Sequence, residues 1–322
     1  MSNYSQKVFS VLRIGLHVNR NIGIRHLSST RNLAMRFIQF KIGGDRGLGV
    51  QLQIDGPVVS LSGADPSIPT DMVSFLNSDY SIGNIQKLVN EKKVVFPANQ
   101  IEFLPCITNP DKVICVGLNY KGHCDEQNKP YPVEPFFFSK FPSTIIGPYD
   151  SVKHSSISKA IDWEVEMAVV IGKKCRKVDV RDAYNFIFGY TVAQDISARD
   201  WQKTRNNGQW LIAKSMDTFC PLGSALVHKS EISDPHSLPI KCAVNGVSKQ
   251  SGSTKELIHR VDALVSFLSN LITLLPGDVI LTGTPSGVGV FREPKEFLKV
   301  GDVIESEIVG IGKMVNPVVE DD

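Results

Sequence analysis

The stretch Asp162-Trp-Glu-Val-Glu-Met-Ala-Val-Val-Ile171 says most about the fold. Successive side chains of a strand point to opposite faces, so Glu164 and Glu166 share one face. The apolar residues from Ala168 to Ile171 predict a strand that enters a core with both faces covered. Two neighbouring carboxylates there repel each other unless a cation neutralises them. The stretch therefore predicts either an oxygen-ligand site for Mg²⁺, Mn²⁺ or Ca²⁺, or two solvated glutamates paired with lysines.

Short strands separated by Gly, Asp and Pro turns account for most of the remaining pattern. Strands are expected at residues 36–42, 49–54, 58–61, 113–116, 163–171, 188–192, 240–244, 278–282 and 302–309. One helix is expected near 81–90, and a second from a Ser253/Glu256 capping box to the Pro276-Gly277 stop. Because strands outnumber helices without alternating with them, we expect an α+β fold that is predominantly β.

Residues 96–110 are rich in Pro and Asn, which is typical of a linker. We therefore expect a small β-rich N-terminal domain over residues 35–105 and a main domain over residues 106–322.

Charge is unevenly distributed along the 322 residues, which carry 35 basic and 33 acidic side chains. Seven basic residues precede Asp45, the first acidic residue, and they are interleaved with Ser, Asn and apolar residues. This pattern predicts a mitochondrial transit peptide over residues 1–34 and a location in the matrix; the alternative is a basic tail. No apolar run approaches the roughly 18 residues that a membrane-spanning helix needs.

Removing the predicted transit peptide leaves 30 basic and 33 acidic residues, a net charge of −3. We therefore expect no nucleic-acid partner and no membrane partner. The six cysteines form no C-x-x-C pair, so free thiols, several of them buried, are expected in a reducing compartment.

Three further positions suggest chemistry. Asp195 ends a strand-like run and suits either a third cation ligand or a helix N-cap. Lys214 interrupts an apolar, strand-like run, so it either snorkels to solvent or faces an anion. His123 and Glu126 share a helical face, which fits either a general acid/base pair or an ordinary surface pair.

A glycine-rich loop, Leu281-Thr-Gly-Thr-Pro-Ser-Gly-Val-Gly289, follows a predicted strand. It matches neither the dinucleotide-binding nor the P-loop pattern, so nucleotide binding is not indicated. Its backbone N–H groups either reach a substrate carboxylate or simply form a tight turn.

These motifs, in this order, resemble the fumarylacetoacetate hydrolase superfamily over roughly residues 110–310. The resemblance is carried by Val116-Gly-Leu-Asn-Tyr with His123 and Glu126, by Trp163-Glu-Val-Glu, by Gln194-Asp-Ile-Ser-Ala-Arg-Asp-Trp201, by Ala213-Lys-Ser and by the glycine-rich loop. It implies a β-roll domain, a homodimer, and Mg²⁺, or else Mn²⁺ or Ca²⁺, held by Glu164, Glu166 and Asp195.

The resemblance also assigns roles to other residues. It implies that His123 and Glu126 act as a catalytic dyad on a lid, together with Lys214 as a catalytic residue. Substrate-binding roles fall to Lys140, Arg199, Gln202 and Thr284. The N-terminal domain is far shorter than in fumarylacetoacetate hydrolase itself, which argues for a different substrate.

The implied activity is a Mg²⁺-dependent reaction of a small 2-oxo acid through a metal-stabilised enolate. We favour keto–enol tautomerisation of oxaloacetate, because Lys214 and Arg199 suit a dicarboxylate and the matrix contains oxaloacetate. The alternatives are decarboxylation of oxaloacetate, hydrolytic C–C cleavage of an acylpyruvate, and a non-catalytic binding protein of the same fold.

Overall fold

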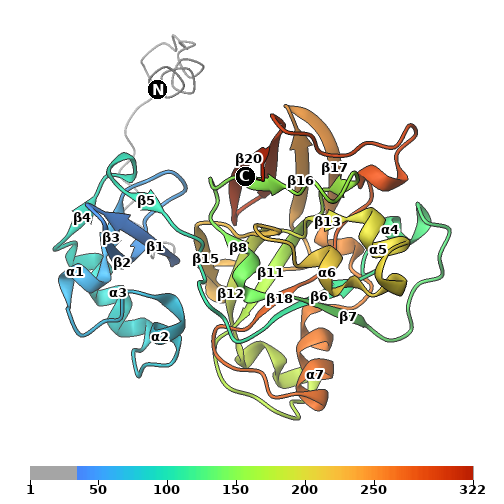
Figure 1. Ribbon diagram of the computed structural model, residues 1–322. Coiled ribbons are helices and arrows are strands. Elements are labelled where there is room, and N and C mark those ends of the chain that lie inside the picture. The colour runs from blue at the N-terminus through green and yellow to red at the C-terminus, as the bar shows by residue number, and fades with distance from the viewer. Residues whose placement is uncertain (1–34, 322) are drawn as a thin grey trace, which may run out of the picture. The chain divides into compact units, whose positions relative to one another are not determined.

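The computed structural model describes residues 35–321, so the transit peptide predicted for residues 1–34 lies outside the described part. Strands outnumber helices in this part of the chain, which confirms the predominantly β character (Figure 1). The predicted strands and the helix near residue 85 are all present, with ends that differ by a few residues.

The largest sheet has 11 strands in the order β4-β3-β2-β1-β15-β12-β11-β18-β6-β7, with β5 paired to β1. Along this path only β18 and β6 are parallel. The strands are β1 (Arg36–Ile42), β2 (Asp45–Gln51), β3 (Val58–Ser60), β4 (Val95–Phe96), β5 (Glu102–Phe103), β6 (Val113–Gly117), β7 (Phe136–Lys140), β11 (Val165–Ile171), β12 (Ile187–Gln194), β15 (Ala225–His228) and β18 (Val279–Leu281).

A second sheet has five strands in the order β17-β16-β19-β20-β9, and two short pairs, β10 with β13 and β14 with β8, complete the β structure. These strands are β8 (Ile145–Ile146), β9 (Val152–His154), β10 (Ile161–Asp162), β13 (Ser197–Ala198), β14 (Cys220–Pro221), β16 (Pro239–Val244), β17 (Val247–Ser253), β19 (Val303–Ile308) and β20 (Gly312–Glu320).

Short helices cover the sheets, and none of those within residues 35–321 is long and apolar enough to span a membrane. Figure 1 shows α4, α5 and α6 close to one another, near β6 and β7. The α-helices are α1 (Leu61–Ala64), α2 (Met72–Leu76), α3 (Ile82–Glu91), α4 (Lys121–Asp125), α5 (Arg199–Lys203), α6 (Trp210–Lys214) and α7 (Val261–Leu271).

Strand β11 is buried on both faces, as its apolar sequence predicts. Met167, Val169 and Ile171 pack in a core shared with the five-stranded sheet and α7. Ala168 and Val170 face the opposite core, which includes side chains of α2 and α3. Burying each such valine or isoleucine contributes about 1.5–3 kcal/mol, so β11 is a rigid base for the residues at its ends.

The predicted linker at residues 96–110 is not free of secondary structure. It contains part of β4 and all of β5, and β5 pairs with β1. Strand β1 in turn pairs with β15, which belongs to the main-domain part of the same sheet. The domain boundary at residue 105 stays a prediction.

The helix predicted to begin at Ser253 begins later. The Ser253/Glu256 capping box is present, but it caps a single 3₁₀ turn, and α7 starts only at Val261. In between, Asn119 accepts a hydrogen bond from Ile258 N at 2.8 Å through its backbone carbonyl. A long-range backbone contact therefore holds this segment extended and delays the helix.

The prediction of a strand around Lys214 was wrong, because this residue ends α6. An apolar run this short does not distinguish a strand from a helix by periodicity. The Gln209 side chain accepts from Leu211 N at the helix start, which favours the helical turn. All six cysteines are free and buried, as expected.

Candidate active site

The ends of β11 and β12 bring the predicted carboxylates together. Val165 lies opposite Gln194, and Asp195 N donates to Glu164 O at 2.9 Å just beyond the strands. Carboxylate oxygens of Glu164, Glu166 and Asp195 lie within 4.8 Å of one another, and all three residues are buried. Asp195 is not a helix N-cap, since Ala198 occupies that position for α5.

Two buried lysines face Asp195. Lys140 Nζ, from β7, lies 2.7 Å from Asp195 Oδ1. Lys214 Nζ, from α6, lies 2.6 Å from Asp195 Oδ2 and 2.7 Å from Glu164 Oε2. Burial lowers the pKa of Lys214, but Asp195 and Glu164 raise it by more, so its pKa lies above the ordinary value. Lys214 therefore faces anions and does not snorkel to solvent.

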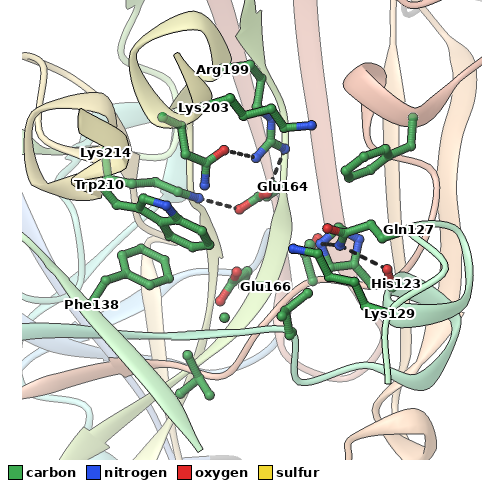
Figure 2. Close-up of a pocket in the computed structure, with 17 residues that line it drawn as sticks. His123, Gln127, Lys129, Phe138, Glu164, Glu166, Arg199, Lys203, Trp210 and Lys214 are labelled. Atoms are coloured by element: carbon green, nitrogen blue, oxygen red, sulfur yellow. Dashed lines mark hydrogen bonds and ion pairs between the residues drawn. The ribbon is translucent and has the colours of Figure 1, made fainter. Parts of the chain in front are cut away.

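Arg199 supplies a third buried cation. Its Nη2 lies 2.6 Å from Glu164 Oε1 (Figure 2), and its Nε lies 2.8 Å from Asp162 Oδ2. Burial raises the pKa of Glu164, but Arg199 and Lys214 together outweigh burial and hold that pKa below its usual range. Glu164 is therefore a firmly ionised carboxylate.

Glu166 has no comparable partner. It accepts a hydrogen bond from Gly283 N at 2.7 Å, but it forms no salt bridge within residues 35–321. Burial, Asp195 and Glu164 together raise its pKa well above the usual value. Together with Asp162, the site holds four buried carboxylates against three buried cations, Lys140, Lys214 and Arg199. This excess of negative charge fits a divalent cation, and an all-oxygen donor set suits Mg²⁺, Mn²⁺ or Ca²⁺.

The predicted dyad lies across the cavity from these carboxylates, with His123 on α4 and Glu126 at its C-cap. His123 Nδ1 lies 2.5 Å from Glu126 Oε1, and Nε2 lies 2.9 Å from Gln127 Nε2. If the Gln127 amide donates a hydrogen bond to Nε2, the neutral His123 ring carries its proton on Nδ1. The unprotonated, basic nitrogen is then Nε2, which faces Gln127. Glu126 Oε2 also accepts from Gly287 N at 2.8 Å, which ties the dyad to the glycine-rich loop.

The backbone N–H groups of the glycine-rich loop are already used by protein carboxylates. Gly283, Gly287 and Gly289 donate to Glu166, Glu126 and Asp162, respectively. At Gly287, φ is +103° and an added Cβ would lie 2.2 Å from Lys249 O, so this position requires glycine. The loop therefore positions the site's acids, and these three N–H groups are not free for a substrate.

A cavity of about 380 Å³ connects the dyad with Glu164 and Glu166. Its lining includes three of the predicted substrate-binding residues, Arg199, Gln202 and Thr284. Lys140, the fourth, does not line it, because the side chain is fully buried behind Asp195.

Sequence reasoning missed several lining residues. They are Gln127 and Lys129 beside the dyad, Lys203 on α5, and the aromatic side chains of Phe138 and Phe291; Trp210 also lines the cavity. Phe138 and Trp210 pack edge to face with ring centroids 5.2 Å apart, which makes one wall apolar. Lys129 and Lys203 lie close in sequence to the recognised motifs, and this proximity was the only signal that could have found them.

Comparison with known proteins decides the family. Residues 112–319 match the model of the fumarylacetoacetate (FAA) hydrolase C-terminal domain. The chain belongs to the fumarylacetoacetate hydrolase family. Mitochondrial oxaloacetate tautomerase fahd2 from Xenopus laevis is 45% identical over 95% of this chain and 98% of its own length. Human mitochondrial oxaloacetate tautomerase FAHD2A is 48% identical over 88% of this chain and 92% of its own. Within that family, these relatives place the chain in the branch of fumarylacetoacetate hydrolase domain-containing protein 2.

Solved structures of family members share the fold. Fumarylacetoacetate hydrolase from Exiguobacterium antarcticum is 31% identical, with a TM-score of 0.80 over 89% of this chain and 100% of its own. Maleylpyruvate hydrolase from a Sphingobium species is 29% identical, with a TM-score of 0.73 over 89% of this chain and 100% of its own. The predicted fold class, a fumarylacetoacetate hydrolase-type domain after a β-rich N-terminal region, is thus confirmed.

Proposed function

We propose that this enzyme is a divalent-cation-dependent oxaloacetate keto–enol tautomerase, with Mg²⁺ as its first choice of cation. The observation that carries the proposal is the cavity itself, which is lined by His123, the partner of Glu126, on one side and by Glu164 and Glu166, the neighbours of Asp195, on the other. The names of the relatives, at 45% and 48% identity, support oxaloacetate as the substrate.

In the proposed mechanism, Glu164, Glu166 and Asp195 hold the cation. When bound, the cation supplies positive charge that acidifies the carbon next to a 2-oxo group. His123 Nε2, once Gln127 turns aside, would remove a proton from that carbon, and the resulting imidazolium would deliver that proton to the 2-oxo oxygen to complete the enol; the reverse reaction would follow the same two transfers backwards. Glu126 holds the imidazole in the required tautomer through Nδ1.

The buried cations have distinct proposed roles. Lys214 acts at the cavity wall, where its ammonium donates a hydrogen bond to the 2-oxo oxygen of the substrate as negative charge develops on that oxygen. Arg199 holds Glu164 in place. Its Nη1 also donates a hydrogen bond of 3.0 Å to Gln202 Oε1, which orients the Gln202 side chain. Thr284 contacts the substrate from the glycine-rich loop. Lys140, which does not reach the cavity, positions Asp195.

The test is an assay of enol-oxaloacetate. Purified protein with Mg²⁺ should accelerate the decay of enol absorbance without matching release of CO₂. An exposed-surface variant, Lys87→Gln on α3, is the matched control and should retain full activity. Failure of the wild-type protein to accelerate the decay in the presence of Mg²⁺, Mn²⁺ or Ca²⁺ would refute the proposal.

Hydrolysis of an acylpyruvate is the second candidate, because two structural relatives are named as hydrolases. Cleavage of acylpyruvates without any effect on oxaloacetate would favour it. Release of CO₂ and pyruvate in step with enol decay would instead identify a decarboxylase. Thermal stabilisation by Mg²⁺ without turnover of any 2-oxo acid would favour a non-catalytic binding protein.

Location and assembly complete the proposal. We infer that residues 1–34 direct the chain to the mitochondrial matrix, in agreement with the names of the relatives. A fluorescent protein fused to these residues should be imported into mitochondria. Replacing their arginines with uncharged residues should abolish this import. We also propose a homodimer, for which light scattering after gel filtration should give twice the mass of the chain.

A further inference from the structure

The two cations first expected to bind a dicarboxylate are already paired. Arg199 is shared between Asp162 and Glu164, and Lys214 is shared between Glu164 and Asp195. Their positive charge is thus neutralised within the protein. A substrate with two carboxylates needs a second source of positive charge, at some distance from the carboxylate cluster.

Lys129 and Lys203 meet this requirement. Both line the cavity, and neither forms a salt bridge with a carboxylate among residues 35–321. In Figure 2, Lys203 lies beside Arg199 and Lys129 lies beside His123, so the two side chains approach the cavity from different elements. The acids that line the cavity are Glu164 and Glu166, and the proposed cation accounts for both.

An aromatic contact holds Lys203 towards the dyad. Its Nζ lies 4.3 Å from the ring centroid of Phe291, within the range of a cation–π interaction. Phe291 also meets the His123 ring edge to face, with centroids 6.0 Å apart. The ammonium of Lys203 is thus kept on the same side of the cavity as the groups that would move the proton.

Like charges are concentrated around this position. Burial first, and then the positive charges of Arg199, Lys295 and Lys129, lower the pKa of Lys203. Repulsion between Lys203 and Lys129, which form no salt bridge among residues 35–321, favours a bound anion. Both lysines are exposed, so they lie at the cavity mouth, where a ligand can reach them without displacing packed side chains.

We propose that Lys129 and Lys203 form a subsite for the second carboxylate of a four-carbon 2-oxo dicarboxylate. The subsite rests on the proposed function, in which the cation lies next to the 2-oxo group, and therefore next to the adjoining first carboxylate, on the other side of the same cavity. It makes the enzyme selective for dianionic substrates over 2-oxo acids that end in an alkyl group. A cavity of about 380 Å³ suits an acid of this size.

The test uses two non-reactive ligands with the same four-carbon chain, malate and 2-hydroxybutanoate. They share the first carboxylate and the 2-hydroxyl, and only malate has the second carboxylate. Calorimetry at low salt with Mg²⁺ should show that the wild-type protein binds malate about tenfold more tightly, since two exposed ion pairs together contribute about that factor. In the double variant Lys129→Gln/Lys203→Gln, the ratio of the two dissociation constants should fall to about one.

Lys121→Gln is the matched control, because Lys121 is an exposed lysine on α4 that does not line the cavity. This variant should keep the wild-type ratio. Equal binding of the two ligands by the wild-type protein, or a ratio that survives in the double variant, overturns the subsite.

Turnover provides an independent readout. With oxaloacetate, the double variant should show a KM raised about tenfold and a kcat within about twofold of wild type. A lowered kcat with unchanged KM would overturn the subsite, because it would assign the lysines to the chemical step. If the wild-type protein fails to turn over oxaloacetate while the malate preference depends on both lysines, the proposed function fails and the subsite stands.

Discussion

Replacing Glu166 with glutamine is expected to stabilise the metal-free protein, whereas the same change at Glu164 should destabilise it. Glu166 is 1% exposed, and its only described partner is the backbone N–H of Gly283. Its oxygens approach those of Glu164 and Asp195 to within 4.8 Å. At an effective dielectric constant of about 20, each such pair of like charges contributes about 3.5 kcal/mol of repulsion.

Lys140 and Lys214 offset part of this repulsion. We therefore expect Glu166→Gln to raise the free energy of unfolding by about 1–2 kcal/mol in EDTA, or a few degrees in Tm. Glu164→Gln instead weakens contacts of 2.6 Å with Arg199 and 2.7 Å with Lys214. Leaving buried cations without their partner costs about 3–5 kcal/mol, so its Tm should fall.

Thermal unfolding with EDTA and with Mg²⁺ measures both effects. The wild-type protein should gain stability on addition of Mg²⁺, and neither variant should, because each has lost one ligand. If both variants lose stability equally in EDTA, Glu166 has a stabilising partner and the charge reasoning is wrong. If both variants keep the full Mg²⁺ effect, the two glutamates are not ligands.

Three other changes test separate parts of the molecule. Glu126→Gln should lower kcat about 10²- to 10³-fold with little change in Tm, because it disturbs the tautomer of His123; unchanged kcat would exclude the dyad. Burial and then Lys229 lower the pKa of His228 to about 4, so its contribution to stability is complete above pH 6.5 and is lost as the pH falls towards 4. The free energy of unfolding should therefore change less between pH 7 and pH 4.5 in His228→Gln than in the wild-type protein, by about 1–2 kcal/mol after allowance for solvent screening. Urea unfolding at the two pH values measures this difference, and an equal change in both proteins would contradict the reasoning. Asn119→Ala should cost about 2–3 kcal/mol in urea unfolding, because it leaves buried backbone groups unpaired, including Thr282 O at 2.8 Å; a loss under 1 kcal/mol would contradict this.

Local periodicity was sufficient for part of this protein. The two-residue repeat of a strand predicted that Glu164 and Glu166 lie close together, and their carboxylates do so although β11 begins only at Val165. Continuous apolar sequence predicted that β11 is buried on both sides. The three-residue spacing of His123 and Glu126 likewise predicted their contact on α4. Each of these inferences depends on a backbone conformation that neighbouring residues determine.

Other features depend on contacts between distant segments. The capping box at Ser253 could not reveal that Asn119 would hold the following residues extended and delay α7. An apolar run could not show that Lys214 ends a helix whose ammonium bridges Glu164 and Asp195. These outcomes follow from hydrogen bonds and ion pairs between residues far apart in the chain, which periodicity does not encode.

The sequence by itself predicted the candidate residues of the site, namely Glu164, Glu166, Asp195 and the pair of His123 and Glu126. Tertiary structure alone decided which cations neutralise which acids. The register of β11 against β12 sets Asp195 beside Glu164, and the packing of α5 and α6 then commits Arg199 and Lys214 to those carboxylates. Arg199 and Lys214 are thus paired with protein carboxylates, whereas Lys129 and Lys203 line the cavity without a salt-bridge partner among residues 35–321. The physical reason is that pairing between charges depends on distances of a few ångströms in space, and these are fixed only when the strands and helices pack.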